Sequence, residues 1–226
     1  MVKKKVIITG SEGIVGSAVC SHLSSLYDLD KISLRFGQDL TDENFVKKYF
    51  KETKAEYLVN CFGFNDHIDA NKENESLFDV NLDSMNKYLS LNIVSLFSVC
   101  REFARNEVAK GIVNISSIYG MVSPLPSLYD NTEKHIGYSV SKGAVIQLTR
   151  HLAVHLAPKI RINCIVLGGI LDKQSDEFKE KYSELTPLKR MMNRSEIGGL
   201  IEYLCSDKST YMTGAIIPLD GGWTAR

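Results

Sequence analysis

Short apolar runs alternate with segments of helical periodicity along most of this chain, and this alternation restricts its fold more than any other feature. The runs have the length of strands that are buried on both faces. They are residues 6–9, 31–35, 57–61, 111–116, 161–166 and 215–218. Helical patterns occupy residues 15–26, 81–106, 138–156 and 194–205. The alternation predicts βαβ units, and therefore a parallel sheet with helices on both faces.

Length and charge restrict the classes of function. The chain of 226 residues is long enough for one well-buried domain, so we expect a single domain over residues 1–226. Its 27 basic and 27 acidic residues cancel, which argues against a nucleic-acid or membrane-surface partner. No apolar run approaches the ~20 residues of a membrane span, and the N-terminus lacks the pattern of a signal peptide.

The cysteines indicate a reducing compartment. They are odd in number, scattered and mostly inside apolar runs: Cys20, Cys61, Cys100, Cys164 and Cys205. This distribution predicts free thiols in a cytoplasmic protein, and no spacing among them suggests a metal site.

A glycine-rich turn, Thr-Gly-Ser-Glu-Gly-Ile-Val-Gly at residues 9–16, follows the first predicted strand and opens the first predicted helix. Glycines there let the backbone approach a pyrophosphate closely, and the helix N-terminus favours its negative charge. We therefore expect a bound nucleotide cofactor at this turn. The candidate contacts are Gly10, Ser11, Glu12, Gly13, Ile14 and Gly16.

Tyr138 and Lys142 lie four residues apart, so a helix places them on one face. A lysine cation close to a phenol favours the phenolate and lowers the tyrosine pKa toward neutral pH. Such a pair could move a proton on or off a hydroxyl while a hydride moves elsewhere. The polar segments 121–136 and 171–193 are the predicted long loops beside it, and loops of that length usually carry function.

Several motifs in the same order resemble the short-chain dehydrogenase/reductase family, nearly from end to end. They are residues 9–16, 60–63 (Asn-Cys-Phe-Gly), 115–117 (Ile-Ser-Ser), 138–142 (Tyr-Ser-Val-Ser-Lys), Gly214 and 220–223 (Asp-Gly-Gly-Trp). The resemblance implies a Rossmann-like, doubly wound parallel sheet, an NAD(P) cofactor, and a cytoplasmic homodimer or homotetramer.

The resemblance also implies four catalytic roles. Tyr138 would be the general acid/base, and Lys142 would lower its pKa and bind the nicotinamide ribose. Ser117 would polarise the substrate oxygen, with Ser116 as the alternative. Asn92 would hold a water in the proton relay. Its competitor, Asn81, is too far from the serine for the family pattern, and asparagine there also suits a helix cap.

Further cofactor contacts follow from the same resemblance: Asp39, Leu40, Asn60, Gly63, Gly168 and Ile170, besides Tyr138 and Lys142. Arg35, near the end of the second predicted strand, favours the 2′-phosphate of NADP, whereas Glu12 in the glycine turn would repel that phosphate. Arg35 could equally be a surface charge. The choice between NAD and NADP therefore stays open.

Two features depart from the family pattern. The glycine spacing Thr-Gly-x-x-Gly-x-x-Gly is that of the extended, epimerase-like branch. The interval between residues 31 and 60 is also too short for two full βα units. We therefore expect the usual second helix and third strand to be lost or reduced, which would leave about six strands.

Loop segments at residues 116–120, 129–132 and 168–172 resemble dehydrogenases of bacterial flagellin-glycan and legionaminic-type sugar pathways. The expected function is an oxidoreductase that interconverts a secondary alcohol and a ketone, on a sugar phosphate or nucleotide-linked sugar. Lys189, Arg190 and Arg194 could meet such a substrate, or could serve the fold. The alternatives are a sugar epimerase or dehydratase with tightly bound NAD(P), and a catalytically silent nucleotide-binding regulator.

Overall fold

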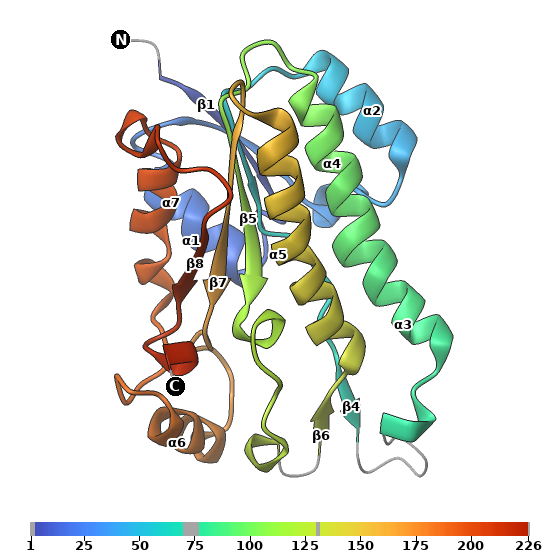
Figure 1. Ribbon diagram of the computed structural model, residues 1–226, viewed down its shortest axis with the longest axis vertical. Coiled ribbons are helices and arrows are strands. Elements are labelled where there is room, and N and C mark those ends of the chain that lie inside the picture. Colours follow the sequence, from blue (N-terminus) through green and yellow to red (C-terminus); the bar gives the residue numbers. More distant parts are fainter. Residues whose placement is uncertain (1–2, 70–76, 130–131, 226) are drawn as a thin grey trace.

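The computed structural model describes residues 3–69, 77–129 and 132–225. Its centre is a six-stranded parallel sheet in the order β2-β1-β3-β5-β7-β8, which confirms the predicted architecture and strand number (Figure 1). The strands are β1 (Lys5–Thr9), β2 (Asp28–Ile32), β3 (Tyr57–Asn60), β5 (Gly111–Ser117), β7 (Arg161–Leu167) and β8 (Ile216–Leu219). The helices are α1 (Ile14–Leu23), α2 (Glu43–Glu52), α3 (Leu82–Leu89), α4 (Ser95–Ala104), α5 (Ile136–Leu156), α6 (Asp176–Leu185) and α7 (Gly198–Leu204).

Two hydrophobic clusters form the core, one on each face of the sheet, because successive side chains of a strand point to opposite faces. Ile7 and Leu58 pack with residues of α2, α4 and α5. Val6 and Val59 pack with residues of α1 and α7. Figure 1 shows these two groups of helices on opposite sides of the sheet.

Strand β2 lies earlier in the chain than predicted. It pairs with β1 residue by residue, from Asp28 opposite Lys5 to Ile32 opposite Thr9, whereas residues 31–35 were expected. After it, the Ser33 hydroxyl accepts a hydrogen bond from the backbone N–H of Arg35, and the chain forms a single 3₁₀ turn. The prediction was wrong because β2 is an edge strand with mostly polar residues. From β2 to β3, where every residue is described, α2 is the one α-helix, which agrees with the expected loss.

The segments predicted as long loops contain regular structure. Helix α6 lies within residues 171–193, and Ser175 caps it by accepting a hydrogen bond from the N–H of Phe178 at 3.2 Å. Strand β6 (Thr132–Lys134) lies within residues 121–136 and pairs antiparallel with β4 (His67–Asp69). Helix α2 was not predicted either. Strands β4 and β6 have only three residues each, too few to show a periodicity, whereas α2 and α6 carry short amphipathic patterns that were overlooked.

The predicted helix 81–106 is interrupted by a π-helical segment, Ser90–Val94. At its start, the side chain of Asn81 accepts a hydrogen bond from the N–H of Asp83 at 2.8 Å, so Asn81 is a helix cap. The π segment turns Asn92 inward, and only 3% of that residue is exposed. Such π turns often occur at functional sites.

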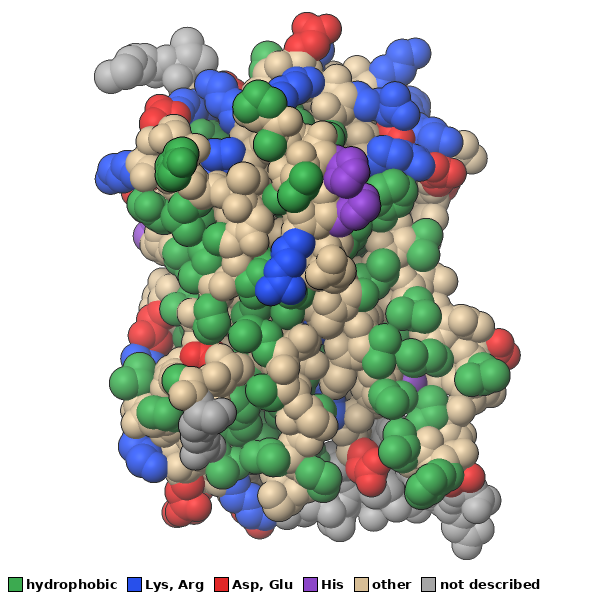
Figure 2. Space-filling view, viewed as in Figure 1, with side chains coloured by type: hydrophobic (Ala, Val, Ile, Leu, Met, Phe, Trp, Pro, Cys, Tyr) green, Lys and Arg blue, Asp and Glu red, His purple; other side chains and the backbone are tan. Residues whose placement is uncertain are grey.

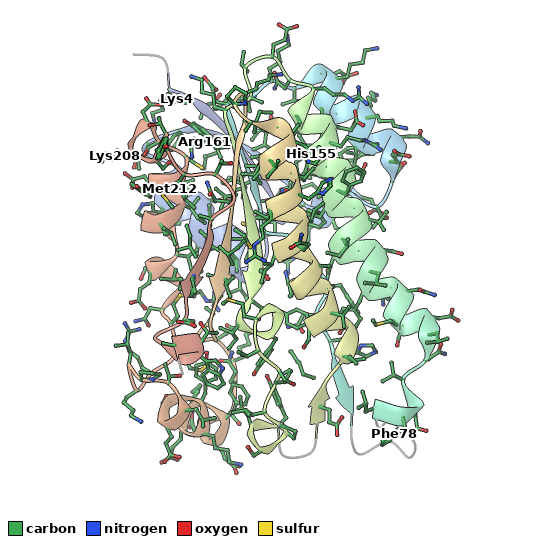
Figure 3. The ribbon with its side chains drawn as sticks, in the orientation of Figure 1. Lys4, Phe78, His155, Arg161, Lys208 and Met212 are labelled. Carbon is green, nitrogen blue, oxygen red and sulfur yellow. The ribbon has the colours of Figure 1, made fainter. Side chains whose placement is uncertain are left out.

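The amino ends of the strands are closed by polar contacts. Arg161 donates hydrogen bonds to the carbonyls of Leu204 and Met212, and Lys4 pairs with Asp207 at 2.8 Å. Figure 3 shows Lys4, Arg161, Lys208 and Met212 gathered at this end. The carboxyl ends of the strands point the opposite way, toward α6 and the β4–β6 ribbon (Figure 1). That is the end at which open α/β sheets bind ligands.

Two further expectations agree with the structure. All five cysteines are free thiols. No helix within the described ranges has both the length and the apolar character that crossing a bilayer requires.

Candidate active site

A cavity of about 670 Å³ opens at the carboxyl ends of the strands. Its walls come from the segments that follow β1, β3 and β7, from β5 itself, and from α5 and α6. The predicted site residues that line it are Gly13, Ile14, Gly63, Ser117, Tyr138, Lys142, Gly168 and Ile170. Tertiary structure therefore brings together residues that are spread over most of the chain.

The glycine turn requires its glycines at two positions. Gly10 has φ +66°, and a Cβ there would lie 2.6 Å from the backbone nitrogen of Phe62. A Cβ at Gly16 would collide with the carbonyl oxygen of Gly10. Gly13 is the N-cap of α1, and it lines the cavity together with the next two residues of the turn, Ile14 and Val15. Gly10, Ser11, Glu12 and Gly16 support the turn from outside the cavity wall.

The turn fits a phosphate group. The first backbone N–H groups of a helix lack partners within that helix and attract anions. The Ser11 hydroxyl is buried and has no hydrogen-bond partner among the described residues. A phosphate oxygen at the start of α1 would suit these donors. The backbone N–H of Ser11 donates to the carbonyl of Ile32 at 3.1 Å, so the turn is fixed to β2.

The two neighbouring serines at the end of β5 have different roles. The Ser116 hydroxyl is buried and donates a hydrogen bond to the carbonyl of Lys142 at 2.7 Å, which ties β5 to α5. Both serines line the cavity, and the Ser117 hydroxyl accepts a weak hydrogen bond from the N–H of Tyr119 at 3.3 Å. Ser117 also hydrogen-bonds the Tyr138 phenol, which Ser116 does not. The geometry therefore favours Ser117 over its alternative.

Tyr138 and Lys142 lie side by side on α5, but their electrostatics differ from the sequence prediction. Burial raises the pKa of Tyr138, and the hydrogen bond with Ser117 lowers it by less. The Lys142 ammonium lies 5.8 Å from the centre of the Tyr138 ring and donates to the Ile115 carbonyl at 3.1 Å. Burial lowers the pKa of Lys142 itself to about 8. The expected lowering of the Tyr138 pKa by Lys142 is wrong for this geometry, because desolvation is the largest cause for both groups.

Asn92 acts as a clamp on the loop after β3. Its Oδ1 accepts a hydrogen bond from the N–H of Phe64 at 2.6 Å, and its Nδ2 donates to the Phe64 carbonyl at 3.0 Å. The same Nδ2 donates to the Ser141 hydroxyl on α5 at 2.9 Å. Both amide hydrogens are therefore committed, and Asn92 does not line the cavity. A Cβ on Gly63 would come within 3.4 Å of Asn92 and of the Lys142 ammonium, so the clamp positions Gly63 against Lys142.

Asn60 supports the sheet, because both ends of its side-chain amide form hydrogen bonds within the core. Its Oδ1 accepts a hydrogen bond from the Thr9 hydroxyl at 3.1 Å, and its Nδ2 donates to Asn114 at 2.9 Å. Asn114 in turn donates to the Thr149 hydroxyl at 3.0 Å. This buried chain of side chains crosses from β1 through β3 and β5 to α5. A satisfied polar network of this kind makes the core specific and rigid.

The predicted adenosine contacts also lie outside the cavity. Arg35 is exposed in the 3₁₀ turn after β2. The Asp39 carboxylate accepts hydrogen bonds from the N–H and the hydroxyl of Thr41, at 2.8 and 2.7 Å. Leu40 is buried in the core. Of these three residues, only Arg35 has an exposed charged side chain for which no partner is described. It lies just after β2, the strand to which the glycine turn is hydrogen-bonded.

The basic residues of the segment 171–193 and its end are engaged in the fold. Arg190 forms two hydrogen bonds with the carboxylate of Glu196, both at 2.7 Å. Arg194 pairs with Asp172, and Lys189 donates to the carbonyl of Glu184 at 2.8 Å. None of the three lines the cavity. These three residues could have met a substrate or served the fold, and their contacts fit the second role.

The sequence analysis missed one wall of the cavity. Its residues are mainly aromatic and aliphatic, with one further cation: Tyr119, Leu128, Tyr129, Lys134, Phe178, Tyr182 and Met191. The spacing of Phe178 and Tyr182, four residues apart, is a helical signal that could have located α6. No local signal points to Lys134, because the β4–β6 ribbon brings it to the cavity.

Comparisons with known proteins agree with this geometry. A family model described as enoyl-(acyl carrier protein) reductase matches residues 17–224. The chain is 26% identical to the post-translational flagellin modification protein A of Campylobacter coli, over 99% of each protein. It is 29% identical to a galactitol 2-dehydrogenase (L-tagatose-forming) of Cereibacter sphaeroides, over 85% of this chain and 76% of that protein.

Among solved structures, a short-chain dehydrogenase of Leptospira borgpetersenii with bound NAD⁺ superposes with a TM-score of 0.87. It is 27% identical, and the match covers 99% of this chain and 94% of that one. A protein of closely similar fold therefore has a solved structure with NAD⁺ bound.

Proposed function

Because the chain belongs to the short-chain dehydrogenase/reductase family, we propose that it is an NAD(P)-dependent oxidoreductase that interconverts a secondary alcohol and a ketone. One observation carries this proposal. Ser117, Tyr138 and Lys142 line a single cavity that also reaches Gly13 and Ile14 at the glycine turn. One cavity therefore contains both a proton-transfer group and a turn that fits a phosphate.

A bound nicotinamide would supply or accept the hydride. Ser117 donates a hydrogen bond to the substrate oxygen, and Tyr138 moves a proton to or from that same oxygen. Because burial raises the pKa of Tyr138, its phenol is protonated at neutral pH and is prepared to donate in the reducing direction. Lys142 and Gly63 form part of the cavity wall near Tyr138. The first turn of α1 binds the pyrophosphate.

For the substrate we propose a sugar derivative, in a bacterial surface-glycan pathway. The similarity to a flagellin modification protein and to a galactitol dehydrogenase supports a polyhydroxylated substrate. The cavity adds aromatic rings at Tyr129 and Phe178, flat apolar surfaces on which a sugar ring can pack. The free cysteines support a cytoplasmic location.

The test is an incubation of the protein with polyols, ketoses, sugar phosphates and nucleotide sugars, each with NAD(H) and with NADP(H). A dehydrogenase changes the near-ultraviolet absorbance of the reduced nicotinamide in proportion to the substrate consumed. An epimerase or dehydratase would convert substrate without net change in the cofactor. A silent regulator would bind the cofactor and convert nothing. Either of the last two results would overturn the proposal.

Cofactor preference gives a prediction for Arg35. The side chain lies in the turn that follows β2, next to the glycine turn, and the residue at the end of the strand is Ser33 rather than an acid. We expect Arg35→Glu to shift preference from NADP toward NAD by about tenfold to a hundredfold, because a charge–phosphate contact contributes about 1.5–3 kcal/mol. Affinity for both cofactors is measured by fluorescence titration.

The matched control is Lys48→Glu, which makes the same charge change at an exposed position of α2. It should leave both affinities unchanged. Equal weakening of NAD and NADP by Arg35→Glu would mean that Arg35 serves the fold and has no role in selecting the cofactor.

We also propose a homodimer or homotetramer that buries the outer faces of α4 and α5. Large apolar side chains are exposed there: Phe97 (41%) on α4, Val154 (77%) on α5, and Val94 (62%) just before α4. Figure 2 shows hydrophobic side chains over the face that carries α3, α4 and α5. Contiguous exposed apolar surface usually marks an interface.

We expect Val154→Asp to dissociate the oligomer, because the change places a charge inside the proposed interface. Light scattering at micromolar concentration should then report the mass of the monomer. Tyr211→Asp is the control, since Tyr211 is fully exposed between α7 and β8 and belongs to neither α4 nor α5. A wild-type protein that is already monomeric would contradict this prediction.

A further inference from the structure

The charges around the cavity are of one sign. Among the described residues that line it, two are charged, Lys134 and Lys142, and none is acidic. Lys142 lies on α5 below the catalytic tyrosine, where the Ile115 carbonyl holds it. Lys134 has no part in the proton transfer proposed above. A cavity with these walls favours an anionic ligand over a neutral or cationic one.

Lys134 stands beside the reacting centre. Its ammonium lies 5.1 Å from the centre of the Tyr138 ring, and the Lys142 ammonium lies 5.8 Å from the same point. Both ammonium groups therefore lie close to the Tyr138 ring. A substrate whose oxygen meets the Tyr138 hydroxyl has its neighbouring substituents within reach of the Lys134 ammonium.

The backbone on both sides of Lys134 is fixed. Lys134 pairs with His67 across the β4–β6 ribbon. The next residue, His135, caps α5 by accepting a hydrogen bond from the N–H of Gly137 at 3.0 Å. The ring of His135 also stacks on Tyr88 at 4.6 Å, and its Nε2 contacts the Ser84 hydroxyl on α3 at 2.8 Å. This cation is preorganised, because its anchor is tied to both α3 and α5.

Burial has a measurable consequence for this side chain. It lowers the pKa of Lys134 to about 8, although the carboxylate of Asp66 acts in the opposite direction. An ammonium that is partly withdrawn from water gains more from an anion than a surface lysine does. Leu128, Tyr129 and Phe178 line the same cavity.

We propose that Lys134 is a specificity-determining residue that binds an anionic group of the substrate, a carboxylate or a phosphate located a few bonds from the reacting carbon. The inference rests on the proposed oxidoreductase function and narrows it from sugars in general to sugar acids or sugar phosphates. The anion and the reacting oxygen would be held on either side of the Tyr138 ring, by Lys134 and by Ser117.

The experiment compares wild type with Lys134→Gln and Lys134→Arg on three substrate classes: sugar acids, sugar phosphates and the corresponding neutral polyols or ketoses. For the anionic class that the wild type uses, Lys134→Gln should lower kcat/KM by about tenfold to a hundredfold, mostly through KM. Neutral substrates should be unaffected, and Lys134→Arg should retain most of the preference. The comparison of sugar acids with sugar phosphates identifies the anion.

The control is Lys173→Gln, which removes the same charge from an exposed residue of the segment before α6. It should leave the preference unchanged. Equal losses on anionic and neutral substrates with Lys134→Gln would overturn the proposal, and would indicate a proton-transfer or structural role instead. Thermal melting of each variant separates that result from misfolding.

A failure of the proposed function would look different, because the wild type would then turn over nothing with either cofactor. In that case the thermal shift produced by gluconate and by inorganic phosphate still tests the anion site. Both anions should raise the Tm of the wild type and not that of Lys134→Gln. The absence of any shift in the wild type would overturn the anion site independently of catalysis.

Discussion

Tyr138→Phe is expected to lower turnover by at least about 10²–10⁴-fold while the fold and the cofactor affinity survive. The substitution keeps the ring, which packs against the core, and removes the one phenol proton that faces Ser117. Turnover is measured with a substrate identified in the panel, and cofactor affinity by titration.

Tyr119→Phe is the matched control for this variant. It removes a hydroxyl from another tyrosine of the cavity wall, one that is hydrogen-bonded to the hydroxyl of Tyr129 at 2.6 Å. Its effect on turnover should be small compared with that of Tyr138→Phe. Near-normal turnover by Tyr138→Phe would end the proposed mechanism and favour the nucleotide-binding regulator.

The raised pKa of Tyr138 also predicts how the rates depend on pH. Reduction needs the protonated phenol, which is present at neutral pH and is lost only in alkali. Oxidation needs the phenolate, so its rate should rise with pH. Parallel pH profiles of the two directions in the wild type would contradict this assignment.

Lys142→Met is expected to abolish most of the activity and yet to stabilise the protein at neutral pH. Lys142 is 7% exposed, and burial lowers its pKa from 10.5 to about 8. A shift of this size corresponds to about 3 kcal/mol of destabilisation while the lysine is charged in both the folded and unfolded states. Loss of its hydrogen bond to Ile115 offsets about 1 kcal/mol, so a net gain of about 2 kcal/mol is expected.

The stability gained by Lys142→Met should decrease as the pH rises. Below about pH 8 the folded protein carries the full cost of the buried ammonium. Between that pH and the ordinary lysine pKa of 10.5, the folded state releases the proton first, so wild-type stability rises and the advantage of Lys142→Met disappears. Urea unfolding at neutral pH and at about pH 10 measures both values.

Lys48→Met, at an exposed position of α2, should change stability by less than about 0.5 kcal/mol at either pH. A Lys142→Met protein that is less stable than wild type at neutral pH would show that the lysine contributes more to packing than its buried charge costs. Lys142 would then increase both the activity and the stability of the protein.

The hydrogen-bond partners of several predicted site residues lie far away in the sequence, so local spacing could not reveal them. Asn60 and Asn92 belong to motifs that local spacing can recognise, but their hydrogen-bond partners lie 28 to 54 residues away in the chain. A pattern reports that an asparagine is present, and cannot report whether its amide faces a ligand or a carbonyl. The same limit applied to Arg190 and Arg194, whose carboxylate partners were found only in the fold.

The sequence by itself determined the features that depend on local order. Alternating apolar runs specify a parallel sheet, glycines at positions 10 and 16 specify a turn that no side chain could enter, and a four-residue interval puts Tyr138 and Lys142 on one helical face. The relation of Gly10 to Gly16 and that of Tyr138 to Lys142 each depend on residues within about two helical turns of one another, where backbone geometry links spacing directly to position.

Only the tertiary structure decided the environment of these groups. It separated Ser117 from Ser116, reversed the expected direction of the Tyr138 pKa, and brought Lys134 to the cavity on a ribbon formed by strands far apart in the chain. Burial and long-range pairing cause all three, because desolvation depends on everything packed around a group, and most of what surrounds these residues comes from distant segments of the chain.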